Sequence, residues 1–454
     1  ICACLVGSEM CIRDRYNRVM KKIAIIFCSF LISLSVLSGF SVSAATTPTT
    51  NDFTVAAKSA IAIDASSGKI LYAQNADDAS TRIASITKLL TAYLVYKNVA
   101  ENKLTWNTKV PISDYAYELT QNSNASNIPL AQNGQYTVKD LLNALLLPSA
   151  NSAAVALAEK IAGSEPKFVD MMTKQMKDWG ITDSHLVNAS GLPNDDLNGH
   201  IYPGSGASAT NTMSAKAVAT LSYHLIQDFP EILQITKKTE IPFDTGNEAK
   251  MTLTNTNQML SGFSTSRTGV DGLKTGSTSF QIDCFAGTTN QNGFRIITVV
   301  LEATDPAADN STPFTLTNQL MNYVYGHWRT TSLVQKNQSL DDFKEITVTD
   351  GKEKSVQLVA PQNITPVVPY ATDGSADTKS LTVKFSKEKT ASVEATVTKN
   401  QKLVTLSTTV KDSLGYLPNC TAEQIPLVAK KTVPRSSAPK VFWNHFVNFV
   451  NEKL

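Results

Sequence analysis

The chain contains Ser85-Ile86-Thr87-Lys88 at the start of a helical pattern that runs to Tyr96. Two further strings follow in order, Ser149-Ala150-Asn151 and Lys274-Thr275-Gly276, and each occurs once. Ser-x-x-Lys alone carries little information because it is frequent in this chain. It begins at Ser66, Ser85, Ser164, Ser386 and Ser437. The ordered set of three strings is therefore the informative feature.

The first string places an alcohol and an amine within reach of each other. A serine hydroxyl needs a neighbouring base to become a good nucleophile. On a helix, Ser85 and Lys88 at i and i+3 share a face. A lysine that acts as base must be neutral, and burial together with a second cation such as Lys274 lowers its pKa. Taken singly, the string is read better as a surface helix start with a capping serine.

The second string follows the apolar run from Leu141 to Leu147, which Pro148 ends. It therefore falls on a turn between two helices, where side chains can project into a cleft. The hydroxyl of Ser149 could relay a proton, and the amide of Asn151 could hold a substrate peptide group. Either residue could instead be an ordinary N-cap of the next helix.

The third string falls on a predicted strand. The ammonium of Lys274 with the hydroxyls of Thr275, Ser277 and Thr278 suits a substrate carboxylate. Gly276 would let a ligand lie against the strand. Alone, this string could equally be a strand end that leads into a polar turn.

The segment from 55 to 325 mixes strands and helices. Hairpins are predicted at Ser59–Asp64 with Lys69–Ala73, and at Cys284–Thr289 with Arg295–Ala303 around the turn Asn292-Gly293. Helices are predicted between them, at Val138–Leu147, Ser152–Ala162 and Glu165–Trp179. Strands at both ends of a segment with helices in the middle indicate an α+β domain, in which one antiparallel sheet is flanked by helices. We assign residues 54–327 to it.

Residues 342–432 have a different character. Short alternating runs at 346–348, 356–359, 381–385, 391–397 and 404–408 predict a small all-β domain. It contains no convincing catalytic constellation.

The two ends of the chain are apolar. Residues 1–19 resemble a translated sequencing adapter and are interpreted as a non-native prefix. Residues 20–45 combine Lys21 and Lys22, an apolar run and a small-residue ending, which is typical of a cleaved signal peptide rather than a retained anchor. Residues 438–454 form an amphipathic pattern too short to span a bilayer. That helix is expected to lie on a membrane surface, although packing on its own domain is the alternative.

Charge and composition exclude several functions. The formal net charge is +2, with no basic runs, which offers no basis for nucleic-acid binding. The histidines form no metal-ligand pattern, and no Gly-x-Ser-x-Gly, Walker or dinucleotide glycine motif is present. No cofactor or metal is expected. Outside the leader, only Cys284 and Cys420 remain, and they are interpreted as unpaired hydrophobic residues.

The three strings together are typical of serine acyl-enzymes that react with penicillins. The contexts Arg82-Ile83-Ala84-Ser85, Leu147-Pro148-Ser149 and Asp271-Gly272-Leu273-Lys274 make the chain resemble the low-molecular-mass penicillin-binding proteins. More narrowly, it resembles their exported D-alanyl-D-alanine carboxypeptidases over residues 55–433 and the tail. This implies a penicilloyl-serine transferase (β-lactamase-like) domain. It also implies removal of the terminal D-alanine from peptidoglycan stem peptides in cell wall biogenesis.

The resemblance also implies roles for residues at the matching positions. Ser85 would be acylated, with Lys88 as its base, and Ser149 would relay the proton. Asn151 would bind a substrate amide, and Lys274 with Thr275 the terminal carboxylate. The backbone N–H groups of Ser85 and Ser277 would form the oxyanion hole. β-Lactam antibiotics would act as covalent inhibitors. The enzyme would be extracytoplasmic, attached to the outer face of the cytoplasmic membrane through residues 438–454.

Two other functions remain open. A serine β-lactamase would share the first half-reaction, and in a class A enzyme a glutamate would activate the deacylating water. Glu165 is the tempting residue, but it opens a helical pattern, and capping is its expected role. A non-catalytic penicillin sensor or wall-binding module is the third possibility.

Overall fold

A five-stranded antiparallel sheet is the centre of the first half of the computed structural model, which describes residues 53–122, 125–246, 250–277, 282–304, 309–385, 392–420 and 423–453. The strand order is β2-β1-β9-β8-β7. The bounds are β1 (Ala57–Asp64), β2 (Ile70–Gln74), β7 (Val270–Ser277), β8 (Ile282–Gln291) and β9 (Phe294–Ala303). Both predicted hairpins are confirmed, and the first joins the last through β1 and β9, with Ala60 opposite Val300. The prefix and the signal peptide predicted for residues 1–45 lie outside the described residues.

The turn between β8 and β9 follows directly from its two residues. Asn292 and Gly293 have φ values of 53° and 84°. Asparagine and glycine tolerate this left-handed region, and two such residues in succession match the twist of a hairpin. The local sequence therefore favours the tight turn that sets the register of β9 against β8.

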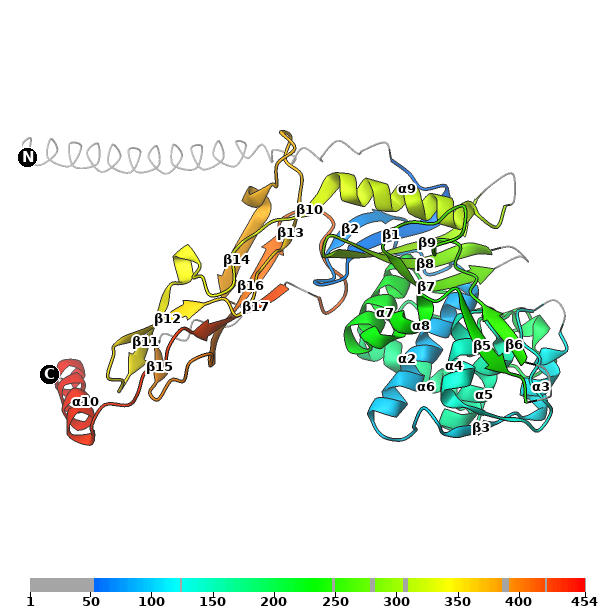
Figure 1. The fold of residues 1–454 in the computed structure, drawn as a ribbon, viewed down its shortest axis with the longest axis horizontal. Helices are drawn as coiled ribbons and strands as arrows, with labels where there is room; N and C mark the ends of the chain where they lie inside the picture. Colours follow the sequence, from blue (N-terminus) through cyan, green and yellow to red (C-terminus); the bar gives the residue numbers. More distant parts are fainter. Residues whose placement is uncertain are drawn as a thin grey trace, which may run out of the picture. The chain divides into compact units, whose positions relative to one another are not determined.

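Helices cover both faces of this sheet. Helix α9 (Thr312–His327) packs on β8 and β9, whereas α7 (Ala215–Asp228) packs on β1 and β9 from the other side (Figure 1). The remaining elements of this part are η1 (Ala84–Thr87), α2 (Lys88–Ala100), α3 (Asp114–Thr120), α4 (Val138–Leu146), α5 (Asn151–Ala162), α6 (Glu165–Asp178), η2 (Asn194–Asp196), η3 (Pro230–Ile232) and α8 (Leu233–Thr236). Two small antiparallel pairs join β3 (Lys109–Pro111) to β4 (Gln135–Thr137) and β5 (Glu240–Asp244) to β6 (Lys250–Thr254). The predicted α+β class is confirmed.

The helix predicted from Ser85 begins in a tighter form than expected. Residues 84–87 form the 3₁₀ turn η1, and the α-helix proper starts at Lys88. Ala84, which opens the turn, has a φ of 44°. Serine and lysine still share a face because side chains three apart eclipse one another in a 3₁₀ turn.

A second, six-stranded sheet forms the later part of the chain. Its order is β14-β16-β17-β12-β11-β15, antiparallel except where β11 pairs with β15. The bounds are β11 (Glu345–Thr349), β12 (Ser355–Val359), β14 (Leu381–Phe385), β15 (Ser392–Glu394), β16 (Lys402–Val410) and β17 (Glu423–Ala429). The strand pair β10 (Trp328–Thr330) with β13 (Val367–Pro369) and the turns η4 (Asp341–Phe343) and η5 (Thr378–Ser380) complete this part. The predicted all-β character is confirmed.

Strand β17 was not predicted. Its run contains Pro426, which normally argues against an internal strand because proline lacks the N–H that a ladder needs. In the structure β12 pairs with β17 only at Val428 and Ala429, so the proline faces a partner only in β16, opposite Thr405. The missing donor is therefore tolerated.

A buried lysine connects the β1–β2 hairpin to the segment between β16 and β17. Lys69 is 1% exposed. Its Nζ lies 2.7 Å from Asp412 Oδ2 and donates to the carbonyl of Gly415 at 2.9 Å. The side chain of Leu417 belongs to the same hydrophobic cluster as the helices below the first sheet. The two parts of the chain therefore share a polar and an apolar contact.

The last helix, α10 (Ala438–Lys453), keeps its aromatic side chains out of any core. Phe442, Trp443, Phe446 and Phe449 are 73%, 63%, 50% and 62% exposed. We call these four residues the aromatic face. Packing of this face on the preceding domain, the alternative considered above, would have buried them. No helix in the described part of the chain is long and apolar enough to cross a bilayer.

Candidate active site

The amine of Lys88 is the centre of the site. Its Nζ lies 2.7 Å from Ser85 Oγ, 2.7 Å from Asn151 Oδ1 and 2.7 Å from the carbonyl oxygen of Ser190. The lysine is fully buried. The structure therefore brings the first and second strings into direct contact.

Burial changes the acid–base chemistry of both lysines. It lowers the pKa of Lys88 well below its ordinary value of 10.5, and the charge of Lys274 lowers it further. Burial also lowers the pKa of Lys274 to about 7. The effect of one ammonium on the other shows that the third string lies close to the first. From the sequence we expected burial and Lys274 to lower the pKa of Lys88 in this way.

Strand β7 lies directly against the turn that carries Ser85. A Cβ atom built on Gly276 would meet the carbonyl oxygen of Ile83 at 3.0 Å and Cγ1 of Ile86 at 3.3 Å. The absence of a side chain at Gly276 therefore permits the close approach of β7 to η1. We had predicted only that it would leave room for a ligand along the strand. Whether a ligand also lies against it remains a prediction.

Ser149 and Asn151 are not helix caps. The residue at the N-cap of α5 is Ala150, and no side chain caps this end. The amide Nδ2 of Asn151 donates to the carbonyl of Ser126 at 2.9 Å, which turns Oδ1 toward Lys88. Ser149 is 4% exposed with a φ of 65°, and its hydroxyl has no hydrogen-bond partner in the described part of the chain. A buried hydroxyl without a partner is costly, which is typical of a functional position.

The side chains of the third string are grouped around Thr275. Among the described residues, Lys274 Nζ donates to the carbonyl and hydroxyl oxygens of Thr275 at 3.2 and 3.3 Å. The hydroxyls of Thr275 and Thr256 lie 2.6 Å apart. Ser277 is the exposed last residue of β7, and Thr278 lies outside the described residues.

Sequence reasoning missed the segment from Asn188 to Gly191. It supplies the carbonyl of Ser190 to Lys88, and Gly191 lies against the turn that carries Ser85. A Cβ on Gly191, whose φ is 86°, would lie 1.9 Å from the carbonyl oxygen of Ala84. The available signal was a cluster of turn residues after a helix, which predicts a loop but not its partner. Thr256, which follows β6, was also missed, because its residue type does not indicate that it meets Thr275.

The expected capping role of Glu165 is wrong. The N-cap of α6 is Ser164, whose side chain makes no cap hydrogen bond. The carboxylate of Glu165 instead accepts from the backbone N–H of Ala189 at 2.9 Å and from the hydroxyl of Tyr115 at 3.1 Å. Among the described residues, no hydrogen bond joins Glu165 to Ser85 or to Lys88.

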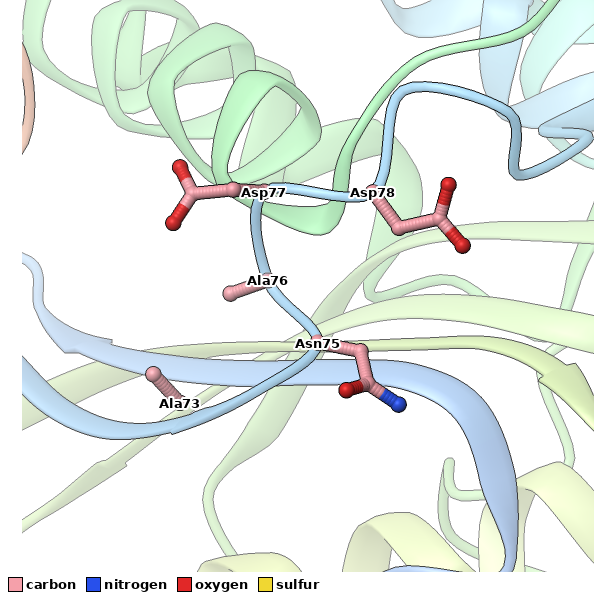
Figure 2. A pocket seen from close by; sticks show the side chains of 5 residues that line it. All are labelled: Ala73, Asn75, Ala76, Asp77 and Asp78. Carbon is pink, nitrogen blue, oxygen red and sulfur yellow. The ribbon is translucent and has the colours of Figure 1, made fainter.

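A hollow beside β2 does not belong to this site. It is lined by Ala73 and residues 75–78, and Figure 2 shows the carboxylates of Asp77 and Asp78 pointing away from each other. Asp77 is paired with Lys216, and Asp78 accepts from the hydroxyl of Ser80 at 2.6 Å. None of the three strings lines it, and its carboxylates already have partners.

No group of three or more His, Cys, Asp or Glu side chains that could hold a metal ion occurs in the described ranges. Cys284 and Cys420 are both free thiols, as the sequence predicted.

The fold and the arrangement of serine, buried lysine and second lysine define a serine acyl-transfer enzyme of the penicillin-binding class. Residues 43–305 match the profile of the family described as D-alanyl-D-alanine carboxypeptidase, peptidase family S11. Residues 328–435 match the C-terminal domain of penicillin-binding protein 5. The chain therefore belongs to the D-alanyl-D-alanine carboxypeptidase family and is a serine-type hydrolase.

Several relatives are similar over most of the chain. The D-alanyl-D-alanine carboxypeptidase DacF of Bacillus subtilis is 28% identical over 357 residues, which are 79% of this chain and 82% of that protein. DacA of Haemophilus influenzae is 32% identical over 279 residues, 60% of this chain and 64% of that protein. The solved structure of a peptidoglycan synthesis regulatory factor (PBP3) from Streptococcus pneumoniae is 41% identical with a TM-score of 0.75, covering 84% of this chain and all of that chain.

Proposed function

We propose that Ser85 is the acylated nucleophile, and Lys88 its general base, of an enzyme that removes the terminal D-alanine from peptidoglycan stem peptides. The observation that carries the proposal is the set of three 2.7 Å contacts around Lys88 Nζ. Family membership supports the reaction class, and these contacts support the choice of residues.

The three contacts fit a neutral amine as well as an ammonium, because the Ser85 hydroxyl can either donate or accept. A neutral lysine has two N–H donors and one lone pair, whereas a charged lysine has three donors. Asn151 Oδ1 and the Ser190 carbonyl can only accept, so they take the two N–H groups. The lone pair is then left for the hydroxyl proton of Ser85. The lowered pKa of Lys88 favours this neutral state.

The proton can then be followed through acylation. Ser85 Oγ attacks the carbonyl carbon of the penultimate D-alanine while its proton passes to Lys88. Collapse of the tetrahedral intermediate breaks the peptide bond, and the leaving amine needs a proton. We assign the relay to the unpartnered hydroxyl of Ser149. Water then hydrolyses the acyl-serine and restores both groups.

Substrate binding is assigned to the third string. Lys274 and Thr275 would bind the terminal carboxylate, with Gly276 and Thr278 beside it, and Asn151 would bind a substrate amide. The backbone N–H groups of Ser85 and Ser277 would receive the oxyanion, and in comparable enzymes one such donor contributes about 3 kcal/mol. A β-lactam carries a carboxylate and a reactive amide, so it would acylate Ser85 in the same way.

Residues 20–45 and helix α10 support a proposal for the location of the enzyme. Residues 20–45 would direct export, and N-terminal sequencing of the exported protein should then find a start near residue 46. The aromatic face of α10 supports attachment to the outer surface of the cytoplasmic membrane, because such rings prefer the lipid headgroup region. The enzyme would thereby act on the wall next to the membrane, in cell wall biogenesis.

The test compares Ser85→Ala with Ser437→Ala. Ser437 begins another Ser-x-x-Lys string but is exposed. We expect Ser85→Ala to lose fluorescent-penicillin labelling and release of D-alanine from diacetyl-L-lysyl-D-alanyl-D-alanine. Ser437→Ala should keep both.

Labelled Ser85→Ala protein with an unchanged circular-dichroism spectrum would contradict the assignment of the nucleophile. Rapid steady hydrolysis of nitrocefin by the native chain would indicate a serine β-lactamase instead. Penicillin labelling without any release of D-alanine would indicate a sensor.

A further inference from the structure

Glu165 is a buried carboxyl group to which the proposed reaction assigns no role. It is 5% exposed, and burial raises its pKa to about 7. Its two oxygens accept from the backbone N–H of Ala189 and from the hydroxyl of Tyr115. A carboxyl group is expensive to bury, so its partners indicate what it holds in place.

Ala189 precedes the residue that contacts Lys88. The carbonyl of Ser190 accepts from Lys88 Nζ at 2.7 Å, and the carbonyl of Ala189 accepts from the hydroxyl of Thr91 at 2.7 Å. The bonds to the N–H and the C=O of Ala189 fix the two peptide units that precede Ser190, and the Ser190 carbonyl lies in the next planar unit, together with the N–H of Gly191. Asn188 closes the same turn from within, by accepting from the N–H of Gly191 at 2.6 Å.

We propose that Glu165 is a positioning residue for Lys88. It anchors the Ala189–Ser190 segment to α6, so that the Ser190 carbonyl accepts one N–H of the amine and the lone pair faces Ser85. This inference rests on the proposed role of Lys88 as base. Without the anchor, the carbonyl can move and the amine can rotate away from the hydroxyl.

The effect is one of hydrogen-bond geometry and not of charge. The pKa of Lys88 is lowered by burial and by Lys274, and Glu165 makes no contribution to that shift. The titratable groups that face Glu165 are Tyr115 and Glu159, and the ring of His200 stacks on Tyr115 at 4.0 Å. Both protonation states of a carboxyl group leave an oxygen that can accept from Ala189. Glutamine at position 165 should therefore retain the hydrogen bond from the N–H of Ala189.

The experiment separates binding from acylation in Glu165→Gln and Glu165→Ala. Stopped-flow mixing with a fluorescent penicillin gives the dissociation constant of the noncovalent complex and the acylation rate. We expect Glu165→Ala to lose about 10- to 100-fold in acylation rate, the cost of a small misplacement of a catalytic group. Its dissociation constant should stay unchanged, and Glu165→Gln should acylate within about threefold of the native rate.

Asp64 provides the matched control. It is a buried carboxylate in the β1–β2 turn that accepts from Ser66 and Ser67, and among the described residues it forms no hydrogen bond to Ser85, Lys88 or Glu165. Asp64→Ala should lower the melting temperature without changing the acylation rate of the folded protein. If Glu165→Ala does not fold, Thr91→Val can be used instead, because it removes the hydrogen bond from the Thr91 hydroxyl to the Ala189 carbonyl. The acylation rate of Thr91→Val must then fall while its dissociation constant stays unchanged.

A native acylation rate in folded Glu165→Ala would overturn the inference. An equal loss in Glu165→Gln and Glu165→Ala would overturn it as well, because glutamine retains the acceptor. These outcomes differ from failure of the proposed function, which would appear as penicillin labelling of Ser85→Ala or as no acylation of the native chain.

Discussion

Replacing Lys274 with glutamine should change both limbs of the pH profile for acylation. Lys274 is 1% exposed, and burial lowers its pKa to about 7. About half of the molecules then carry the ammonium at pH 7 and about 1% at pH 9. If this ammonium binds the ligand carboxylate, acylation efficiency should fall about 50-fold between these pH values in the native enzyme. The substitution should abolish that alkaline limb.

The acid limb of the profile, which would report deprotonation of Lys88, should shift to higher pH in Lys274→Gln. If Lys88 is the base, acylation should rise with pH as Lys88 becomes neutral. The charge of Lys274 lowers the pKa of Lys88, so removing it raises that pKa. Lys274→Gln should therefore need a higher pH to reach its maximal rate. A bound carboxylate stabilises the ammonium, so the alkaline limb of the native enzyme should lie at higher pH under saturating ligand.

The assay is the second-order acylation constant for a fluorescent penicillin, measured from pH 5 to pH 10. Lys174 offers a control, because it is 74% exposed and its ion pair in the described part of the chain is with Asp178 on its own helix. Lys174→Gln should reproduce the native profile. A native profile that stays flat to pH 9.5, or an unchanged alkaline limb in Lys274→Gln, would refute the reasoning.

Two further predictions test close approach and membrane contact. Gly191→Ala should reduce acylation at least tenfold, because its Cβ would collide with the Ala84 carbonyl. Gly199 also has a φ of 86° but has open space around it. Gly199→Ala should therefore cost only about 1–2 kcal/mol of stability, measured by urea unfolding, and leave acylation unchanged. Equal activity of the two variants would contradict the collision. The native chain should sediment with phospholipid vesicles, and the double variant Trp443→Ser, Phe446→Ser should remain largely in the supernatant. Native protein that stays in solution would exclude attachment through the aromatic face.

Local patterns were sufficient for most elements of the fold. Alternating strands, the Asn292-Gly293 turn and the apolar run ended by Pro148 each depend on residues close in sequence. The hairpins and helices that they predicted are present. The β17 strand was not predictable in this way, because Pro426 is acceptable only where a neighbouring strand happens to end.

The candidate active site likewise contains residues that the local sequence indicates and groups that only the fold selects. The side chains of Ser85, Lys88, Asn151 and Lys274 could be named in advance because their chemistry is visible in their residue types. The Ser190 carbonyl could not, since every residue has a carbonyl and only the fold selects one. Glu165 was visible but misread, because its partner, the N–H of Ala189, is a backbone group distant in sequence.

The sequence by itself determined which functional groups are available and the order in which the chain presents them. Only the tertiary structure decided their protonation and direction. It removed water from Lys88 and Lys274, which lowers both pKa values, and it enclosed Lys88 between two acceptors and one hydroxyl. The physical reason is that burial and hydrogen-bond direction depend on neighbours from distant parts of the chain, which no local pattern encodes.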